Sequence, residues 1–431
     1  MKNKILLVHP SLRRLYPLES ESSKRHKLEP LSLEMIQSHN PYNVDSVIYD
    51  MDVYPNVNDF TNFLADYLPT VVGITINTPV VKEAKSIIET SKKVLPRAFF
   101  IVGGNHATHL PEHSLSYTGA DMVWRGDAED FLQKVVEWDL PDGVRTGKIN
   151  KIYTGKSLED EEGKFVMDRL NFPYRHKPAD YFYTTMQTSR GCIWKCIYCG
   201  SADKSVRWRT AQNIINELLE LDNLGLIGKN MYFLDDCFLD YPKRVYELCH
   251  LIKQHNLHPH FWVETRADTI NSDIIKAIKE IGCYQLTFGL ESGNQKILDS
   301  LNKKLTITKV RESIKICVEE GMRIRANFMI GHLGETENEV MDTIKFAEEL
   351  MNLGVTTIAF YKVLPLPGTP LFRMVMANGI KIEREFEDFA WYGKTVSRMS
   401  KIEPERLDEL HKLAYERIES VSNKNRKESD Y

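Results

Sequence analysis

The sequence predicts an α/β protein with two parallel sheets, an N-terminal doubly wound sheet followed by a partial (β/α)6 barrel. Short apolar strand-like runs alternate with amphipathic helical stretches over residues 4–137 and again over residues 181–375. Strands separated by helices imply parallel pairing through right-handed crossovers. A length of 431 residues also exceeds that of a typical single domain.

The first domain is expected to span residues 1–137. Its predicted strands are Lys4–His9, Asp45–Tyr49, Val71–Ile76, Phe99–Val102 and Met122–Trp124. Two strand ends are followed by glycine-containing segments, Gly103-Gly104-Asn105-His106 and Gly126-Asp127-Ala128-Glu129. Ligands bind at the carboxyl ends of strands in open parallel sheets, so these segments are candidate ligand contacts. Residues 138–180 show little periodicity and are interpreted as a connector with room for a hairpin over Lys151–Val166.

The second alternating series is expected to form the barrel over residues 181–375. Its predicted strands are Phe182–Thr188, Met231–Leu234, Phe261–Glu264, Tyr284–Gly289, Arg323–Ile330 and Thr357–Val363. Six β/α units are fewer than the eight of a closed barrel, so an open barrel is expected. Residues 376–431 are expected to be a helical extension, helical mostly over 381–420, with a frayed tail over Asn423–Tyr431.

Composition and charge restrict the class of protein. Hydrophobic residues make up 42% of the chain and the net charge is −4, which gives no electrostatic indication of a nucleic-acid partner. No stretch approaches the roughly 20 apolar residues of a membrane helix. Seven cysteines without an export signal indicate a reducing compartment. We therefore expect a cytoplasmic protein without membrane or nucleic-acid partners.

Three of the seven cysteines lie within eight residues, as Cys192-Ile-Trp-Lys-Cys196-Ile-Tyr-Cys199. Thiolates at this spacing can hold one iron–sulfur cluster and leave one iron without a protein ligand. A structural zinc site normally needs four ligands, and a distant residue such as Cys237 keeps that alternative open. The other cysteines are interpreted as small buried hydrophobic residues; they are Cys237, Cys249, Cys283 and Cys317.

This C-x3-C-x2-C motif, which follows the first barrel strand and has Tyr198 before its last cysteine, resembles the signature of the radical S-adenosylmethionine (SAM) superfamily. The resemblance implies a 4Fe–4S cluster on Cys192, Cys196 and Cys199, with SAM on the open iron. It continues at later strand ends, in Leu234–Phe238, Glu264–Asp268 and Gly289–Gly293. The SAM-binding residues that it implies are Tyr198, Asp236, Arg266, Glu291 and Ser292. Two alternatives are that Asp235 and Asp236 cap the following helix and that Arg266 and Glu291 form an ordinary ion pair.

Residues 65–135 are similar to the cobalamin-binding domains that precede some radical SAM barrels. The cobalamin contacts that this similarity implies are Thr75, Thr78, Gly103, Gly104, His106, Gly126 and Glu129. The Asp-x-His-x-x-Gly motif that supplies an axial histidine in many cobalamin proteins is absent, so a cobalt without a protein histidine is expected. The alternative is a domain that kept its fold and lost its ligand.

Together these resemblances imply a cobalamin-dependent radical SAM enzyme that methylates an unactivated carbon of a small molecule and takes electrons from a flavodoxin or ferredoxin. A second possibility is radical cyclisation, rearrangement or redox chemistry without methyl transfer. A third, of another class, is a cobalamin or cluster sensor without turnover. A tRNA methylthiotransferase is disfavoured because the first cysteine in the chain is Cys192, which leaves the N-terminal domain without cluster ligands. The sequence identifies neither catalytic residues nor the substrate.

Overall fold

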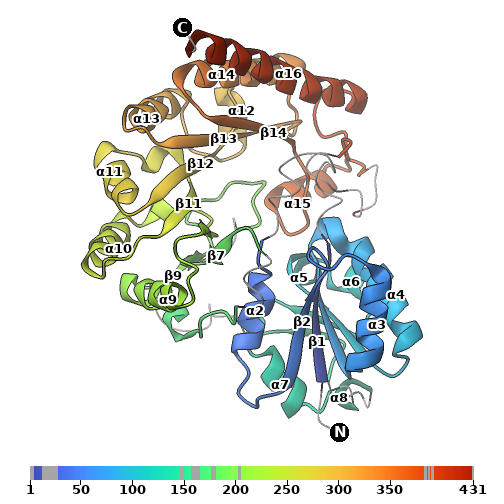
Figure 1. The fold of residues 1–431 in the computed structure, drawn as a ribbon. Helices are drawn as coiled ribbons and strands as arrows, with labels where there is room; N and C mark the ends of the chain where they lie inside the picture. Colours follow the sequence, from blue (N-terminus) through green and yellow to red (C-terminus); the bar gives the residue numbers. More distant parts are fainter. Residues whose placement is uncertain are drawn as a thin grey trace. The chain divides into compact units, whose positions relative to one another are not determined.

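A computed structural model of the chain describes residues 4–11, 28–140, 142–145, 147, 149–156, 166–175, 181–201, 205–382, 386, 389 and 393–429. The chain divides into two compact units. The first contains Met1–Phe182 and Glu385–Ala390, and the second contains Tyr183–Arg384 and Trp391–Tyr431 (Figure 1). No helix in the described ranges is both long and apolar enough to cross a lipid bilayer.

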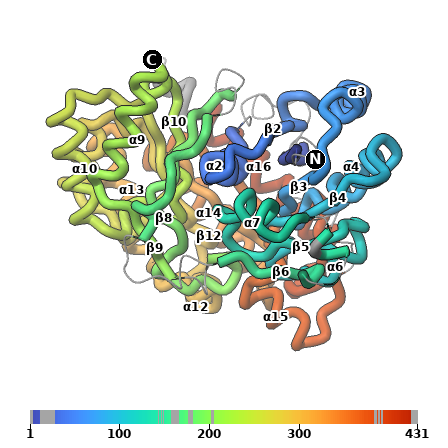
Figure 2. Tube along the Cα trace, turned by 90° about the horizontal axis from the view of Figure 1, so that it is seen from below, coloured from blue at the N-terminus to red at the C-terminus, as the bar shows by residue number. Residues whose placement is uncertain are grey.

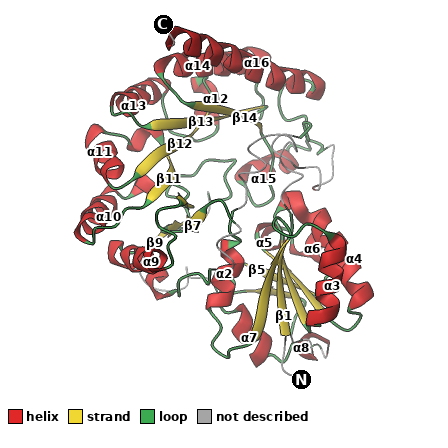
Figure 3. Cartoon of the chain, viewed as in Figure 1, coloured by secondary structure: helices red, strands yellow, loops and turns green. Residues whose placement is uncertain are grey.

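The first unit contains a parallel sheet of six strands in the order β2-β1-β3-β4-β5-β6. The strands are β1 (Lys4–His9), β2 (Asp45–Asp50), β3 (Val71–Thr75), β4 (Phe99–Gly103), β5 (Met122–Arg125) and β6 (Ile152–Thr154). The first five confirm the predicted strands. Helices pack on both faces, as Figure 3 shows, so the unit is doubly wound. One face packs against α3 (Val57–Tyr67), α4 (Val81–Val94) and α5 (Asn105–His109), and the other against α2 (Leu31–Ser38) and α7 (Phe131–Glu137). The remaining described helices of this unit are α6 (Pro111–Thr118) and α8 (Asp142–Arg145).

Strand β6 lies in the range that the sequence indicated was a connector. It pairs in parallel with β5, so these residues form an edge strand of the first sheet. Tyr153 packs its ring 4.7 Å from that of Trp124 and 4.5 Å from that of Trp138. A strand of three residues is too short to show a recognisable alternation of apolar and polar residues. The contacts of the Tyr153 ring with the two tryptophans stabilise strand β6. Residues 157–165, the rest of the expected hairpin, lie outside the described residues.

The second unit contains six parallel strands in the order β14-β13-β12-β11-β10-β7. They are β7 (Thr184–Met186), β10 (Asn230–Phe233), β11 (His260–Thr265), β12 (Cys283–Glu291), β13 (Arg323–Ile330) and β14 (Thr357–Lys362). Strand β7 pairs only with β10 and strand β14 only with β13 within the described residues, so the sheet does not close on itself and the expected open barrel is confirmed. Helices cover its outer face (Figure 1). They are α9 (Ala211–Asn223), α10 (Pro242–Gln254), α11 (Ser272–Glu280), α13 (Ile307–Glu319) and α14 (Glu337–Leu353), with the short α12 (Gln295–Ser300) after β12.

The C-terminal region differs from the predicted helical extension. After α15 (Pro370–Ala377), Ile382 and Ser397 form an antiparallel bridge, and the next α-helix among the described residues is α16 (Pro404–Ser429). The prediction of helix over 381–420 is therefore wrong for the described residues 381, 382 and 393–403. The expected frayed tail is also wrong up to Ser429, because its lysine and glutamate residues have good helix propensity and continue α16.

A two-stranded antiparallel ribbon encloses the cysteine loop. It consists of β8 (Ser189–Arg190) and β9 (Arg207–Trp208), which lie side by side in Figure 2. The loop begins at Gly191, whose φ is +87° and whose added Cβ would lie 2.3 Å from the Ser205 carbonyl oxygen. Only glycine fits this turn without strain. The ribbon therefore closes the base of the loop that carries the three cysteines.

Candidate functional site

The three clustered cysteines lie on the loop between β8 and β9. Cys196 is buried, Cys192 and Cys199 are half-buried, and none of the seven cysteines of the chain forms a disulfide. Burial raises the pKa of Cys192 to about 12 and also raises the pKa of Cys199. These two raised pKa values favour the thiol form, and a cluster binds thiolate, so its binding at Cys192 and Cys199 would release protons.

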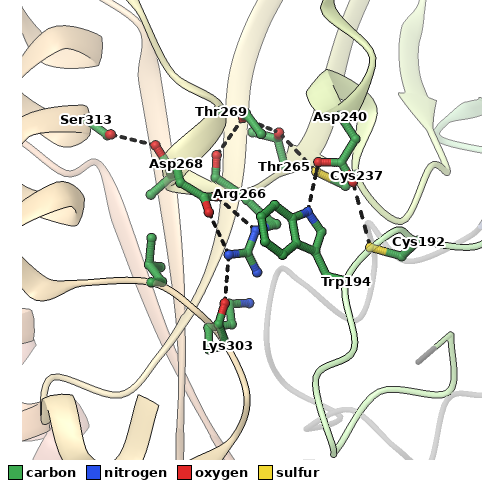
Figure 4. A network of polar contacts seen from close by, with 12 residues as sticks. Cys192, Trp194, Cys237, Asp240, Thr265, Arg266, Asp268, Thr269, Lys303 and Ser313 are labelled. Atoms are coloured by element: carbon green, nitrogen blue, oxygen red, sulfur yellow. Dashed lines mark hydrogen bonds and ion pairs between the residues drawn. The ribbon is translucent and has the colours of Figure 1, made fainter. Parts of the chain in front are cut away.

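Asp240, on the short helix η6 (Phe238–Asp240), contacts this loop (Figure 4). Its Oδ1 accepts hydrogen bonds from Trp194 Nε1 at 3.0 Å and from Cys237 Sγ at 3.0 Å, and Cys192 Sγ donates to Oδ2 at 3.8 Å. Burial raises the pKa of Asp240. Sequence reasoning missed Asp240, because nothing in its local pattern distinguishes it from an ordinary helix residue. It also missed the polar contact of Cys237, which is buried as expected.

Arg266 follows β11 and packs flat against the cysteine loop. Its guanidinium carbon lies 3.7 Å from the centroid of the Trp194 ring. Its Nε and Nη2 donate to Asp268 at 2.9 and 2.8 Å, and Nη2 also donates to the Lys303 carbonyl at 2.8 Å. The alternative of an Arg266–Glu291 ion pair is therefore wrong. Nη1 is buried without a hydrogen-bond partner among the described residues, so it has capacity for a ligand acceptor.

Tyr198, Glu291 and Lys303 form a buried triad beside Cys199. The Tyr198 hydroxyl donates to Glu291 Oε1 at 2.7 Å, and Lys303 Nζ lies 2.8 Å from the same oxygen and 3.0 Å from the hydroxyl. Burial, with the charge of Glu291 next, raises the pKa of Tyr198. Glu291 has a φ of +66°, a conformation that non-glycine residues rarely adopt and that is often found at functional sites. Lys303 was missed because a lysine in the segment that follows the predicted strand Tyr284–Gly289 gives no signal of burial.

The loop after α12 contacts the backbone of the cysteine loop. Ile197 N donates to the Leu301 carbonyl at 3.1 Å, and Asn302 Nδ2 donates to the Lys195 carbonyl at 2.7 Å. Asn302 and Lys304 both have positive φ, of 52° and 51°. This strained loop therefore orders the cysteine loop and presents Lys303 to it.

The remaining predicted SAM residues differ in their surroundings. Asp236 accepts a hydrogen bond from Ser201 Oγ at 3.0 Å. The Ser292 hydroxyl is buried against Thr343 of α14 at 2.9 Å, which gives it a structural contact. Asp235 caps no helix: it accepts from the amides of Thr188 at 2.7 Å and Ser189 at 3.1 Å. It thereby joins the end of β10 to the chain that enters the cysteine loop.

The inner face of the barrel sheet is polar and aromatic. The rings of Tyr232 and Trp262 stack with centroids 3.7 Å apart. Glu264, Thr287 and Arg325 occupy one register row on β11, β12 and β13. A barrel interior that needed only to be filled would carry branched apolar side chains. These residues therefore provide hydrogen-bonding groups where the sheet faces away from its helices.

In the first unit, the predicted glycines lie at the carboxyl edge of the sheet, with different surroundings. Gly104 has a φ of +98°, and an added Cβ would lie 2.8 Å from the Ile76 carbonyl oxygen and 3.0 Å from Thr75 Oγ1. Gly104 is thus required by the fold itself. At Gly103 and Gly126 the nearest atoms would lie 3.5 and 3.9 Å away, which leaves exposed backbone that a ligand can approach. Glu129, also predicted, is half-buried between β5 and α7.

The predicted residue His106 is buried, and both its ring nitrogens contact neighbouring side chains. Nδ1 lies 3.1 Å from Thr78 Oγ1, and Nε2 lies 3.0 Å from His113 Nδ1. Burial lowers the pKa of His106 to about 4, followed by the charges of neighbouring histidines. Thr78 and His106 therefore contact each other, and the His106 ring has no nitrogen left for a metal.

A histidine that sequence reasoning did not select lies at the end of β1. His9 Nδ1 is 3.2 Å from Asp50 Oδ1, and Asp52 is near enough that the ligand atoms of all three residues lie within 4.8 Å. Burial lowers the pKa of His9, but the hydrogen bond and charge of Asp50 outweigh it, so the pKa is raised overall. The sequence offered one signal of this contact, because both residues lie at the end of a predicted strand or directly after it. In the structure these two strands, β1 and β2, pair in parallel and place His9 opposite Asp50.

Comparisons with known proteins agree with both units. Residues 186–347 match the radical SAM superfamily model, and residues 25–136 match the B12 binding domain model. An uncharacterised methyltransferase of Pyrococcus horikoshii is 28% identical, with 90% of this chain and 86% of the relative covered. Cytidylyl-2-hydroxyethylphosphonate methyltransferase of Streptomyces wedmorensis is 25% identical, with 75% of this chain and 69% of the relative covered.

Two solved structures share the fold over most of the chain. The radical SAM methyltransferase TsrM from Kitasatospora setae, solved with cobalamin and a 4Fe–4S cluster, has a TM-score of 0.69 at 17% identity, with 88% of this chain and 75% of TsrM covered. The cobalamin-dependent SAM radical enzyme OxsB has a TM-score of 0.68 at 16% identity, with 87% of this chain and 61% of OxsB covered. The chain therefore contains a radical SAM domain that follows a B12-binding domain.

Proposed function

We propose that the protein is a cobalamin-dependent radical SAM methyltransferase that methylates an unactivated carbon of a small molecule. The observation that carries the proposal is the three-cysteine loop, ordered by Asp240, Arg266 and Lys303, in a chain whose other unit matches the B12-binding domain. The names of the two curated relatives support methyl transfer.

Cys192, Cys196 and Cys199 are the proposed cluster ligands. Three thiols on one loop suit an iron–sulfur cluster, because thiolate is its preferred ligand. When bound, the cluster would supply an electron for reductive cleavage of SAM, and cobalamin would carry the methyl group. The contacts of Trp194 and Asn302 keep the loop ordered, so that the protein supplies positioning and the cofactors supply reactivity.

SAM is proposed to bind beside this loop, against Tyr198, Asp236, Arg266, Glu291 and Lys303. The unpartnered Nη1 of Arg266 suits a carboxylate of the ligand, and the Glu291 carboxylate suits an ammonium group. Ser292 is proposed to support this site from behind through Thr343. Water exclusion follows from the burial of Arg266, Glu291 and Lys303.

Cobalamin is proposed to bind the first unit at the carboxyl edge of its sheet. Gly103 and Gly126 expose backbone there, near Thr75 and Glu129. Residues 1–137 with β6 are proposed as this domain, and residues 181–375 as the radical SAM domain. The substrate is proposed to contact the inner barrel face around Trp262, Thr287 and Arg325. A flavodoxin or ferredoxin is the proposed electron donor.

The test is anaerobic reconstitution with iron, sulfide, hydroxocobalamin, SAM and a reductant, followed by mass spectrometry of a treated cell extract. Methyl transfer predicts both 5′-deoxyadenosine and S-adenosylhomocysteine, together with a product one methyl group heavier. Deoxyadenosine alone would favour radical chemistry without methylation, and neither product would favour a sensor. The Cys196→Ala variant is the control, because it should form neither.

A further inference from the structure

The ends of β1 and β2 preorganise one imidazole in the first unit. Asp50 Oδ1 lies 3.2 Å from His9 Nδ1 and accepts a hydrogen bond from the Asp52 backbone amide at 2.8 Å. Asp50 Oδ2 accepts a hydrogen bond from the Tyr181 hydroxyl at 3.0 Å. Asp50 is almost completely buried. Its carboxylate therefore has its oxygens occupied and acts as a fixed acceptor for the His9 ring.

This contact determines which nitrogen His9 offers to a ligand. With Asp50 as the acceptor the proton lies on Nδ1, which leaves the lone pair on Nε2. The hydrogen bond of the His9 side chain that the described residues show is made by Nδ1, and the side chain is 17% exposed. A histidine whose other nitrogen donates to a carboxylate is the usual form of a metal-binding histidine.

His9 and His106 both lie at the carboxyl edge of the first sheet, but only His9 has a ring nitrogen available for a metal. Both nitrogens of His106 contact Thr78 and His113. The Asp50 carboxylate accepts three hydrogen bonds and Asp52 Oδ1 accepts one from the Ser11 hydroxyl at 2.7 Å, so His9 Nε2 is the donor that we consider for a metal. A single nitrogen donor of this kind would suit a cobalt that a corrin ring already holds.

We infer that His9 Nε2 is an axial ligand of cobalt, with Asp50 as its positioning residue. The inference rests on the proposed binding of cobalamin to the first unit and adds a ligand that the absence of an Asp-x-His-x-x-Gly motif argued against. In that motif the carboxylate lies two residues before the histidine. Here His9 lies at the end of β1, and its carboxylate partner, Asp50, lies on the neighbouring strand β2.

The test is electron paramagnetic resonance of the full-length protein loaded with cob(II)alamin, after equilibrium dialysis has measured how much cobalamin is bound. Nitrogen ligation splits the cobalt lines into triplets. Protein grown on nitrogen-15 and loaded with unlabelled cobalamin should show doublets, because the ligand nitrogen then belongs to the protein. His9→Gln should lose the splitting and retain bound cobalamin, whereas His250→Gln, at an exposed position on α10, should keep it.

The outcomes separate this inference from the proposed function. Bound cobalamin without nitrogen splitting would overturn the His9 assignment and leave the methyltransferase proposal standing. Triplets that persist in labelled protein would assign the ligand to the base of the cofactor and would also overturn it. The labelling experiment needs no variant, so poor folding of His9→Gln does not prevent a decision. No binding of cobalamin to folded wild-type protein would overturn both.

Discussion

Lys303 Nζ lies 2.8 Å from Glu291 Oε1, and this buried ion pair contacts the tyrosine that directly precedes Cys199. The pair joins the loop after α12 to the end of β12, where Glu291 has positive φ. Removing either residue would leave the charge of the other buried without a partner, which is costly. Each residue therefore stabilises the folded site through the charge of the other.

We expect Lys303→Met to weaken SAM binding to the reconstituted protein at least tenfold and to destabilise the fold by about 3 kcal/mol. The reason is that Glu291 would remain buried without its cation. SAM affinity by equilibrium dialysis and thermal melting measure the two effects. Lys304→Met is the matched control, because Lys304 is the exposed neighbour and should leave both unchanged. Equal affinities in the two variants would contradict the placement of Lys303 in the SAM site.

Alanine at Cys192, Cys196 or Cys199 should abolish cluster formation, since the loop offers no other thiolate at this spacing. Iron and sulfide analysis after anaerobic reconstitution measures the effect. Cys249→Ala, Cys283→Ala and Cys317→Ala should retain full iron content. Cys237→Ala is the demanding control, because its thiol shares Asp240 with Cys192. Loss of the cluster in Cys237→Ala would revive the alternative of a fourth protein ligand.

Asp240→Leu should lower the yield of cluster and destabilise the second unit by about 1–3 kcal/mol, because the Trp194 N–H and the Cys237 thiol lose their acceptor. Trp194→Phe removes the same N–H and keeps a ring for Arg266 to stack on, so its loss should be smaller. The double variant should cost less than the sum of the two single variants. Strict additivity would show that the two residues do not act through their hydrogen bond.

Acid should destabilise the first unit through His106. Its pKa is about 4 in the folded chain and 6.5 when unperturbed, so the unfolded state binds the proton more strongly between these values. The stabilisation is complete above pH 6.5 and is lost as the pH falls toward 4, by up to about 1.4 kcal/mol per pH unit. Thermal melting of wild type and His106→Gln from pH 7 to pH 4.5 measures the difference. Parallel curves for the two proteins would contradict this assignment.

Gly103→Ala and Gly104→Ala should differ in stability, although they are neighbours. Gly104→Ala should cost about 2 kcal/mol or more, because its φ is +98° and its Cβ would meet the Ile76 backbone. Gly103→Ala should change stability by only about 0.5 kcal/mol. Chemical denaturation measures both. If Gly103→Ala nevertheless weakens cobalamin binding, the exposed backbone there is a ligand contact, whereas a loss with Gly104→Ala reports only the fold.

The strands and the cysteine loop were predictable because they depend on local patterns. Apolar runs of four to eight residues and three cysteines in one loop are visible in the sequence itself. The contacts of the loop were not, because Asp240, Lys303 and Arg266 reach it from separate strand ends and loops. Their partners are decided by tertiary packing, which no sequence spacing reports.

The first unit was harder to delimit for a related reason. Strand β6 is only three residues long, and its place beside β5 follows from packing of Tyr153 against Trp124 and Trp138. The backbone conformation of single residues could not be predicted from the sequence either. Gly104 resembled a ligand contact in the sequence, while the structure shows that its own backbone neighbours require it.

Phe386 and Phe389 belong to the first unit although nearly the whole second unit precedes them in the chain. Phe389 is fully buried, and Phe386 packs within 5.5 Å of His106 and 5.2 Å of His113. During translation the N-terminal unit therefore leaves the ribosome without these two rings and completes its core only after residue 390 has been synthesised. A fragment ending near residue 182 would lack them as well, so no single cut in the gene separates the two units.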